Sequence, residues 1–185
     1  LSSITLQFFF TAMAGLVLGA RWGAASQAIY VLLGLAGLPI FSAGGGAGYI
    51  FYPSFGFLLG LIPAAYVTGR LCGGCKRPAR IALACAAGLG VLYLVGLPYM
   101  AMILNGYMGK GMSVSGLLWA GMIPFLPGDA IKIAVTALLC PLLGKLSKNA
   151  GKRTVICALF ASAVCAAMQL VQVVRGGSAL HYWLG

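Results

Sequence analysis

The chain has 185 residues, of which 62% are hydrophobic and only 7% are charged, and its mean hydropathy is +1.03. Soluble domains carry about a quarter charged residues, so this composition excludes them and predicts an integral membrane protein. The formal net charge of +11 does not indicate a nucleic-acid partner, because the Lys and Arg residues stand at the ends of apolar segments and not along one polar face.

Several apolar segments are long enough to cross the hydrocarbon core, which takes about 20 helical residues. We therefore expect an all-α integral membrane protein that forms a single transmembrane domain over residues 1–185, a six-transmembrane-helix bundle. The first two spans are short and are joined by a tight turn at Gly19–Gly23. The expected spans are Ile4–Ala20, Trp22–Leu38, Phe55–Leu71, Ile81–Leu104, Leu117–Leu143 and Thr154–Val174.

The fifth span contains Pro124 and Pro127. Proline removes a backbone donor and clashes with the preceding turn of a helix, so we expect Ile123–Pro127 to be irregular or to begin a new helix. Asp129 would then lie in the first turn of that helix, where the positive end of the helix dipole stabilises a carboxylate.

Asp129 is the only acidic residue of the chain, and Lys132 follows three residues later. On a helix this spacing places both side chains on one face. A charged side chain inside a membrane costs at least about 2.5–3.5 kcal/mol, so an ionisable pair at that depth predicts a functional site.

Basic residues predict the orientation of the spans, because cytoplasmic loops carry an excess of Lys and Arg. With the Gly19–Gly23 turn in the cytoplasm, nine basic residues lie inside and two, Lys110 and Arg175, lie outside. The inner set is Arg21, Arg70, Lys76, Arg77, Arg80, Lys145, Lys148, Lys152 and Arg153.

Two glycine-rich loops are predicted on the outer side, and the first of them, Pro39–Pro53, carries no charge. The segment Ser42–Tyr49 is rich in glycine and is bracketed by aromatic residues, and we expect it to act as a glycine-hinged flap that closes over an apolar ligand. The aromatic residues could equally form the interfacial belt that most membrane proteins have. Asn105–Ser115 is a second outer loop of similar composition.

Cys72 and Cys75 have the spacing of half a zinc site or of a redox motif. No second pair lies near them in the sequence and the one histidine, His181, is distant, so we expect exposed, reduced thiols in a cytoplasmic turn and no metal. The other cysteines fall within spans and are expected to pack as small apolar side chains.

Three classes of function use an ionisable pair inside a membrane protein. A membrane enzyme needs a second ionisable group, a nucleophile with its base or a set of metal ligands, and one acid with one distant histidine does not supply them. A proton-coupled carrier that uses the Asp129–Lys132 pair, and a solute-binding subunit without catalysis, both remain. The sequence contains no Walker motif, so any ATP hydrolysis must belong to another chain.

Short motifs, in order and spacing, make residues 4–145 similar to the biotin-specific substrate-binding component (BioY) of energy-coupling factor transporters. These motifs are Ile4-Thr5-Leu6-Gln7, Gly37-Leu38-Pro39-Ile40-Phe41, Tyr52-Pro53-Ser54-Phe55-Gly56-Phe57 and Pro127-Gly128-Asp129-Ala130-Ile131-Lys132. The resemblance implies a six-helix membrane protein that captures the vitamin from outside and docks with a transmembrane coupling subunit and cytoplasmic ATPase subunits. An S component for another vitamin is the alternative within this class.

The chain departs from the family pattern at both ends. The family has a helix before the first motif and ends soon after the last one, whereas here Thr154–Val174 follows. We expect this additional helix to occupy the first-helix position, with an unrelated edge helix as the alternative. Its small residues would allow close helix approach, and the resemblance implies contact with the coupling subunit: Ala158, Ser162, Ala163 and Ala167.

The resemblance implies that Asp129 and Lys132 contact biotin. An ionised carboxylate only accepts hydrogen bonds, which suits the two ureido N–H groups, and Lys132 can donate to the ureido oxygen or to a carboxylate. Gln7 and Ser54 are further polar candidates near helix ends. The expected aromatic walls are Tyr52, Phe55, Phe57 and Tyr93. No cofactor is expected.

Overall fold

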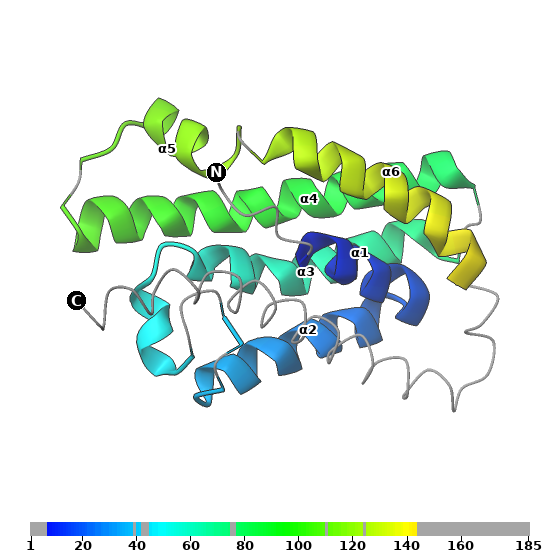
Figure 1. Ribbon diagram of the computed structural model, residues 1–185, viewed down its shortest axis with the longest axis horizontal. Coiled ribbons are helices and arrows are strands. Elements are labelled where there is room, and N and C mark those ends of the chain that lie inside the picture. The colour runs from blue at the N-terminus through cyan, green and yellow to red at the C-terminus, as the bar shows by residue number, and fades with distance from the viewer. Residues whose placement is uncertain are drawn as a thin grey trace, which may run out of the picture.

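The computed structural model describes residues 7–143, apart from residues 39, 42–44, 75–76, 110 and 124. Figure 1 shows long helices that run roughly parallel to the long axis of the molecule. The elements in chain order are α1 (Gln7–Leu18), α2 (Ala20–Leu35), a 3-10 helix (Ala47–Phe51), α3 (Phe55–Cys72), α4 (Pro78–Ala101), a π-helical extension of α4 (Met102–Tyr107), α5 (Val114–Gly121) and α6 (Leu126–Leu143).

Helices α3 and α4 pack along their length, α2 flanks α3, and α6 flanks α4. Helix α1 contacts α2, α3 and α6, so it lies between the two halves of the bundle. Its buried face consists mainly of small and apolar residues, among them Ala12, Met13 and Ala14. The residues that carry the candidate site come from helices that meet in this bundle: α1, α3, α4 and α6.

The first four expected spans correspond to helices, and the fifth does not form one continuous helix. Instead α5 ends at Gly121 and α6 begins at Leu126, which confirms the break expected at Ile123–Pro127. Pro127 is the second residue of α6. In the first turn of a helix the backbone N–H groups have no helical partner, so proline, which lacks this group, fits a helix start but not a helix interior. The sixth expected span, Thr154–Val174, lies outside the described residues.

Two helices in the described ranges are long and apolar enough to cross a membrane: Phe55–Cys72, and Pro78–Tyr107, which joins α4 to its π-helical extension. Many large apolar side chains of the bundle face outward, including Leu83 and Leu94 on α4 and Leu138 on α6. An apolar exterior is compatible with a lipid environment, in which buried polar groups and close helix packing hold a bundle together.

The turn between α1 and α2 consists of Gly19, whose φ of 86° is strained for residues with a side chain. Beyond this turn the backbones of three helices meet at glycines. A Cβ atom on Gly23 would lie 2.7 Å from the Cα of Gly15, and one on Gly69 would lie 2.6 Å from the backbone nitrogen of Ala20. These contacts place the α1–α2 turn against the carboxyl end of α3.

The expectation of an exposed Cys72 is wrong. Cys72 is the last residue of α3 and is buried in the hydrophobic core. The chain leaves the helix only at Gly73, so Cys72 lies on the same inward face as the buried Thr68, one helical turn earlier. Gly73, with a φ of 49°, is the left-handed residue that ends the helix. The expectation of a packed Cys85 is confirmed, since its side chain is fully buried in the same core.

Candidate functional site

Asp129 lies in the first turn of α6, as expected. Its backbone nitrogen donates to the carbonyl oxygen of Phe125 at 2.9 Å, so the helical hydrogen bonds begin just before the carboxylate. The aspartate is 4% exposed and is the only acidic residue of the chain. The amino end of a helix presents unpaired N–H groups and a partial positive charge, which stabilise a carboxylate at this depth.

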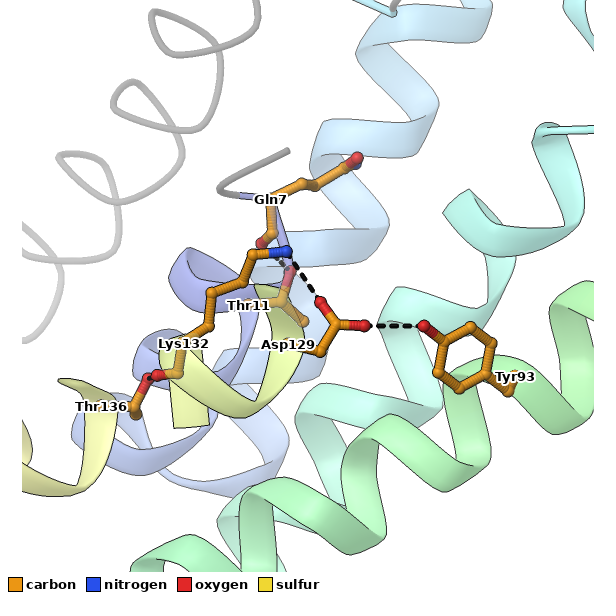
Figure 2. Close-up of polar contacts among 6 residues, drawn as sticks. All are labelled: Gln7, Thr11, Tyr93, Asp129, Lys132 and Thr136. Atoms are coloured by element: carbon orange, nitrogen blue, oxygen red, sulfur yellow. Dashed lines mark hydrogen bonds and ion pairs between the residues drawn. The ribbon is translucent and has the colours of Figure 1, made fainter. Parts of the chain in front are cut away.

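Each oxygen of this carboxylate accepts from one side chain among the described residues. Lys132 Nζ donates to Oδ1 at 2.7 Å and the phenol of Tyr93 donates to Oδ2 at 2.7 Å. Figure 2 shows the carboxylate held between the lysine of its own helix and the tyrosine of α4. Lys132 is 7% exposed, so both charges are removed from solvent and neutralise one another. Tyr93 is thus more than the apolar wall that the sequence predicted.

Neighbouring side chains pack around Asp129, Lys132 and Tyr93. Thr136, one turn after Lys132 and fully buried, donates to the Lys132 carbonyl oxygen at 2.7 Å. The ring of Phe57 on α3 meets the ring of Tyr93 edge to face, with centroids 6.2 Å apart and an interplanar angle of 87°. Four of the predicted site residues, Asp129, Lys132, Tyr93 and Phe57, therefore form one contiguous group.

Gln7 begins α1 on the side of the bundle that carries this group (Figure 2). Its Nε2 is, among the described side chains, a buried nitrogen without a hydrogen-bond partner. An unsatisfied buried donor costs about 1–3 kcal/mol. A ligand oxygen that accepts a hydrogen bond from Gln7 Nε2 would remove that cost.

Buried polar residues of α1 and α2 were not singled out from the sequence. The Thr11 hydroxyl lies 2.9 Å from the Gln7 carbonyl oxygen and 3.1 Å from Oε1 of Gln27, and both Thr11 and Gln27 are buried. Gln27 also reaches the hydroxyl of Ser26 at 3.5 Å. The sequence does show these polar residues inside apolar spans, but their spacing does not tell which of them face the interior of the bundle.

The remaining predicted residues lie in a second aromatic group at the amino end of α3. Tyr52 is 48% exposed and stacks on Tyr49, with ring centroids 5.1 Å apart. Ser54 lies 3.1 Å from the Tyr49 hydroxyl, and Phe55 is buried against Tyr99. The contacts found for Tyr52, Ser54 and Phe55 are with this group, and the structure does not join them directly to Asp129.

The 3-10 helix Ala47–Phe51, which overlaps the end of the predicted flap, contacts α4 and the second predicted outer loop. The Tyr99 hydroxyl donates to the carbonyl oxygen of Ile50 at 2.6 Å, and the ring of Phe51 stacks on that of Tyr107 at 5.3 Å. The backbone of Gly46 donates to Gly34 of α2 at 2.8 Å. The described part of the predicted flap, residues 45–49, runs from Gly45 and Gly46 into this 3-10 helix, which is held at several points, and its closing over a ligand stays a prediction.

A family model described as the BioY family matches residues 1–149. The chain is 35% identical over 148 residues to a probable biotin transporter BioY of Lysinibacillus sphaericus, covering 79% of this chain and 76% of that protein. It is 37% identical over 143 residues to a biotin transporter BioY of Thermotoga maritima, covering 77% and 80%.

The fold is similar to a solved structure. A crystal structure of the S-component for biotin from an ECF-type ABC transporter matches with a TM-score of 0.55 at 24% sequence identity. The match covers 76% of this chain and 74% of that chain. At this level of identity the likeness supports a shared arrangement of helices.

Proposed function

Because this chain belongs to the BioY family, we propose that it is the biotin-binding membrane subunit of a vitamin uptake transporter. The observation that carries the proposal is the buried Asp129–Lys132 pair with Tyr93 on the second carboxylate oxygen, in a chain whose family relatives are biotin transporters. The protein binds and releases its ligand and is not an enzyme.

The chemistry of the group suits the ureido ring of biotin. Among the described side chains, each oxygen of Asp129 accepts from one donor, and a carboxylate oxygen can accept a further bond, so an N–H group of the ureido ring can be added without breaking the ion pair. Lys132 has three donors, of which one is used, and can reach the ureido oxygen. Gln7 offers one more buried donor, and Phe57 with Tyr93 offers apolar ring surface.

Titration calorimetry of the purified protein in detergent tests this function. We expect biotin to bind with a stoichiometry of one, and riboflavin and pantothenate to give no heat of binding, because pantothenate has no cyclic urea and the three fused rings of riboflavin are much larger than the bicycle of biotin. Binding of another vitamin in place of biotin would establish the alternative, an S component of different specificity. Heat from none of the three would remove the proposed function.

Energy for uptake comes from other chains in this proposal. The sequence holds no nucleotide-binding motif, so the partners would be a transmembrane coupling subunit and cytoplasmic ATPase subunits. Residues 154–174 lie outside the described part of the chain. Their small residues, Ala158, Ser162, Ala163 and Ala167, remain a proposed contact with the coupling subunit, in the position of the family's first helix.

We further propose a multi-pass protein of the bacterial plasma membrane with six spans and the orientation that the basic residues predict. The described arginines support it: Arg21, Arg70, Arg77 and Arg80 are all exposed and lie next to the α1–α2 and α3–α4 turns. Contact of Gly69 with Ala20 places these turns at the same end of the bundle.

Cysteine labelling in intact cells tests this orientation. In a background with Cys72→Ala and Cys75→Ala, a membrane-impermeant maleimide added outside should label Gly48→Cys and should label Arg77→Cys only after the cells are opened. Both positions are exposed, and a side chain on Gly48 meets no neighbouring atom. The reverse pattern would invert the proposed topology.

A further inference from the structure

Two glycines on facing helices each receive an aromatic ring from the opposite helix. A Cβ atom on Gly96 of α4 would overlap the ring of Phe57 of α3, and a Cβ atom on Gly56 of α3 would overlap the side chain of Tyr99 of α4. The two contacts are reciprocal, and they belong to different groups. The Gly56 contact serves the outer aromatic group, whereas the Gly96 contact lies beside the buried ion pair.

The Gly96 contact leads to Asp129 through two rings. Gly96 and Tyr93 are three residues apart on α4 and therefore share one face of the helix. Phe57 lies against both, since its ring fills the space above Gly96 and meets Tyr93 edge to face. Tyr93 in turn donates to Asp129 Oδ2. The ring of Phe57 thus sits where it fixes the direction of the phenol.

We propose that Gly96 and Phe57 are positioning residues for the binding carboxylate, acting through the Tyr93 hydroxyl, a role that rests on the biotin site proposed above. With Tyr93 fixed, the plane of the Asp129 carboxylate is set by Lys132 on one oxygen and Tyr93 on the other. The carboxylate then has a fixed orientation beside Lys132, which suits a ligand that presents an N–H group to Asp129 and an adjacent carbonyl oxygen to Lys132. Each edge of a cyclic urea has this arrangement.

Substitution of Gly96 tests the proposal, because alanine adds a single carbon where Phe57 now lies. We expect Gly96→Ala to turn Phe57 and Tyr93 and to weaken biotin binding by roughly tenfold or more, as does Tyr93→Phe, which removes only the hydroxyl. In a Tyr93→Phe background, Gly96→Ala should cost no further affinity, because both changes remove the same hydrogen bond.

Gly90→Ala is the matched control, because Gly90 is on the same helix and an added carbon there meets no atom within 4 Å. It should bind biotin like the parent. A packing role alone for Gly96 predicts losses that multiply in the double variant, and that result, or parental affinity of Gly96→Ala, would overturn the proposal.

A measurement on the ligand-free protein distinguishes failure of this inference from failure of the proposed function. The infrared band of the Tyr93 phenol, isolated as the difference between the parent and Tyr93→Phe, should shift in ligand-free Gly96→Ala and stay unchanged in Gly90→Ala. An unshifted band in Gly96→Ala refutes the positioning role whether or not the protein binds biotin. Failure of the parent to bind biotin, with the band shifted as expected, would refute the proposed function alone.

Discussion

Asp129→Asn is expected to lower the affinity for biotin by roughly ten- to a hundredfold. Hydrogen bonds to a charged group contribute about 1.5–3 kcal/mol, and asparagine is uncharged and carries an NH₂ donor group in place of one acceptor oxygen. Titration calorimetry in detergent measures the change. Unchanged affinity would place the ligand elsewhere in the molecule.

Removing one charge of a buried pair also changes stability, so the binding result needs a stability control. Breaking such a pair costs about 3–5 kcal/mol, because the remaining charge is left without a partner. We therefore expect Asp129→Asn and Lys132→Met each to lower the thermal midpoint of the detergent-solubilised protein. The double variant, Asp129→Asn with Lys132→Met, should recover most of the midpoint and still fail to bind biotin, which would separate folding from recognition.

Gly15→Ala is expected to have the largest effect on folding. A Cβ atom at Gly15 would overlap the carbonyl oxygen of Ala65 in the backbone of α3, and backbone cannot move aside as a flexible side chain can. Overpacking of this kind costs about 1–3 kcal/mol and occasionally more, and here it also separates α1 from α3 and from the Gly23 contact in α2. We expect little monodisperse protein in size-exclusion chromatography.

Gly90→Ala serves again as the control, because alanine is the better helix former and meets no neighbour there. It should elute like the parent, with an equal or higher thermal midpoint. If Gly15→Ala behaved in the same way, the close approach of α1 to α3 would not be required for assembly.

The sequence predicted those parts of the molecule that depend on local composition and spacing. The apolar runs located α3 and α4 to within a few residues, and the two prolines located the break before α6. The spacing of Asp129 and Lys132 predicted their contact, because residues three apart on a helix are neighbours in any fold. The family resemblance rested on such local motifs too.

Features that depend on how the helices face one another could not be predicted from the sequence. The bond from Tyr93 to Asp129 joins residues that are 36 positions apart, and nothing in the spacing of α4 distinguishes Tyr93 from Tyr99, which donates instead to Ile50 in the outer loop. The burial of Cys72 depended on where α3 ends relative to its inward face. Rotation of each helix about its own axis decides these cases, and it is fixed by packing among all the helices.

The pairing of Asp129 with Lys132 has an electrical consequence. A moving charge does work against the membrane potential of about 2.3 kcal/mol per elementary charge per 100 mV. Two opposite charges held 2.7 Å apart carry no net charge, so the empty site can be displaced within the bilayer at almost no electrical cost. Biotin brings a carboxylate, and the loaded site then carries one negative charge. In a cell that is negative inside, inward movement of the loaded site would therefore require electrical work. This work arises from the charge of the ligand, because the paired charges of the protein cancel.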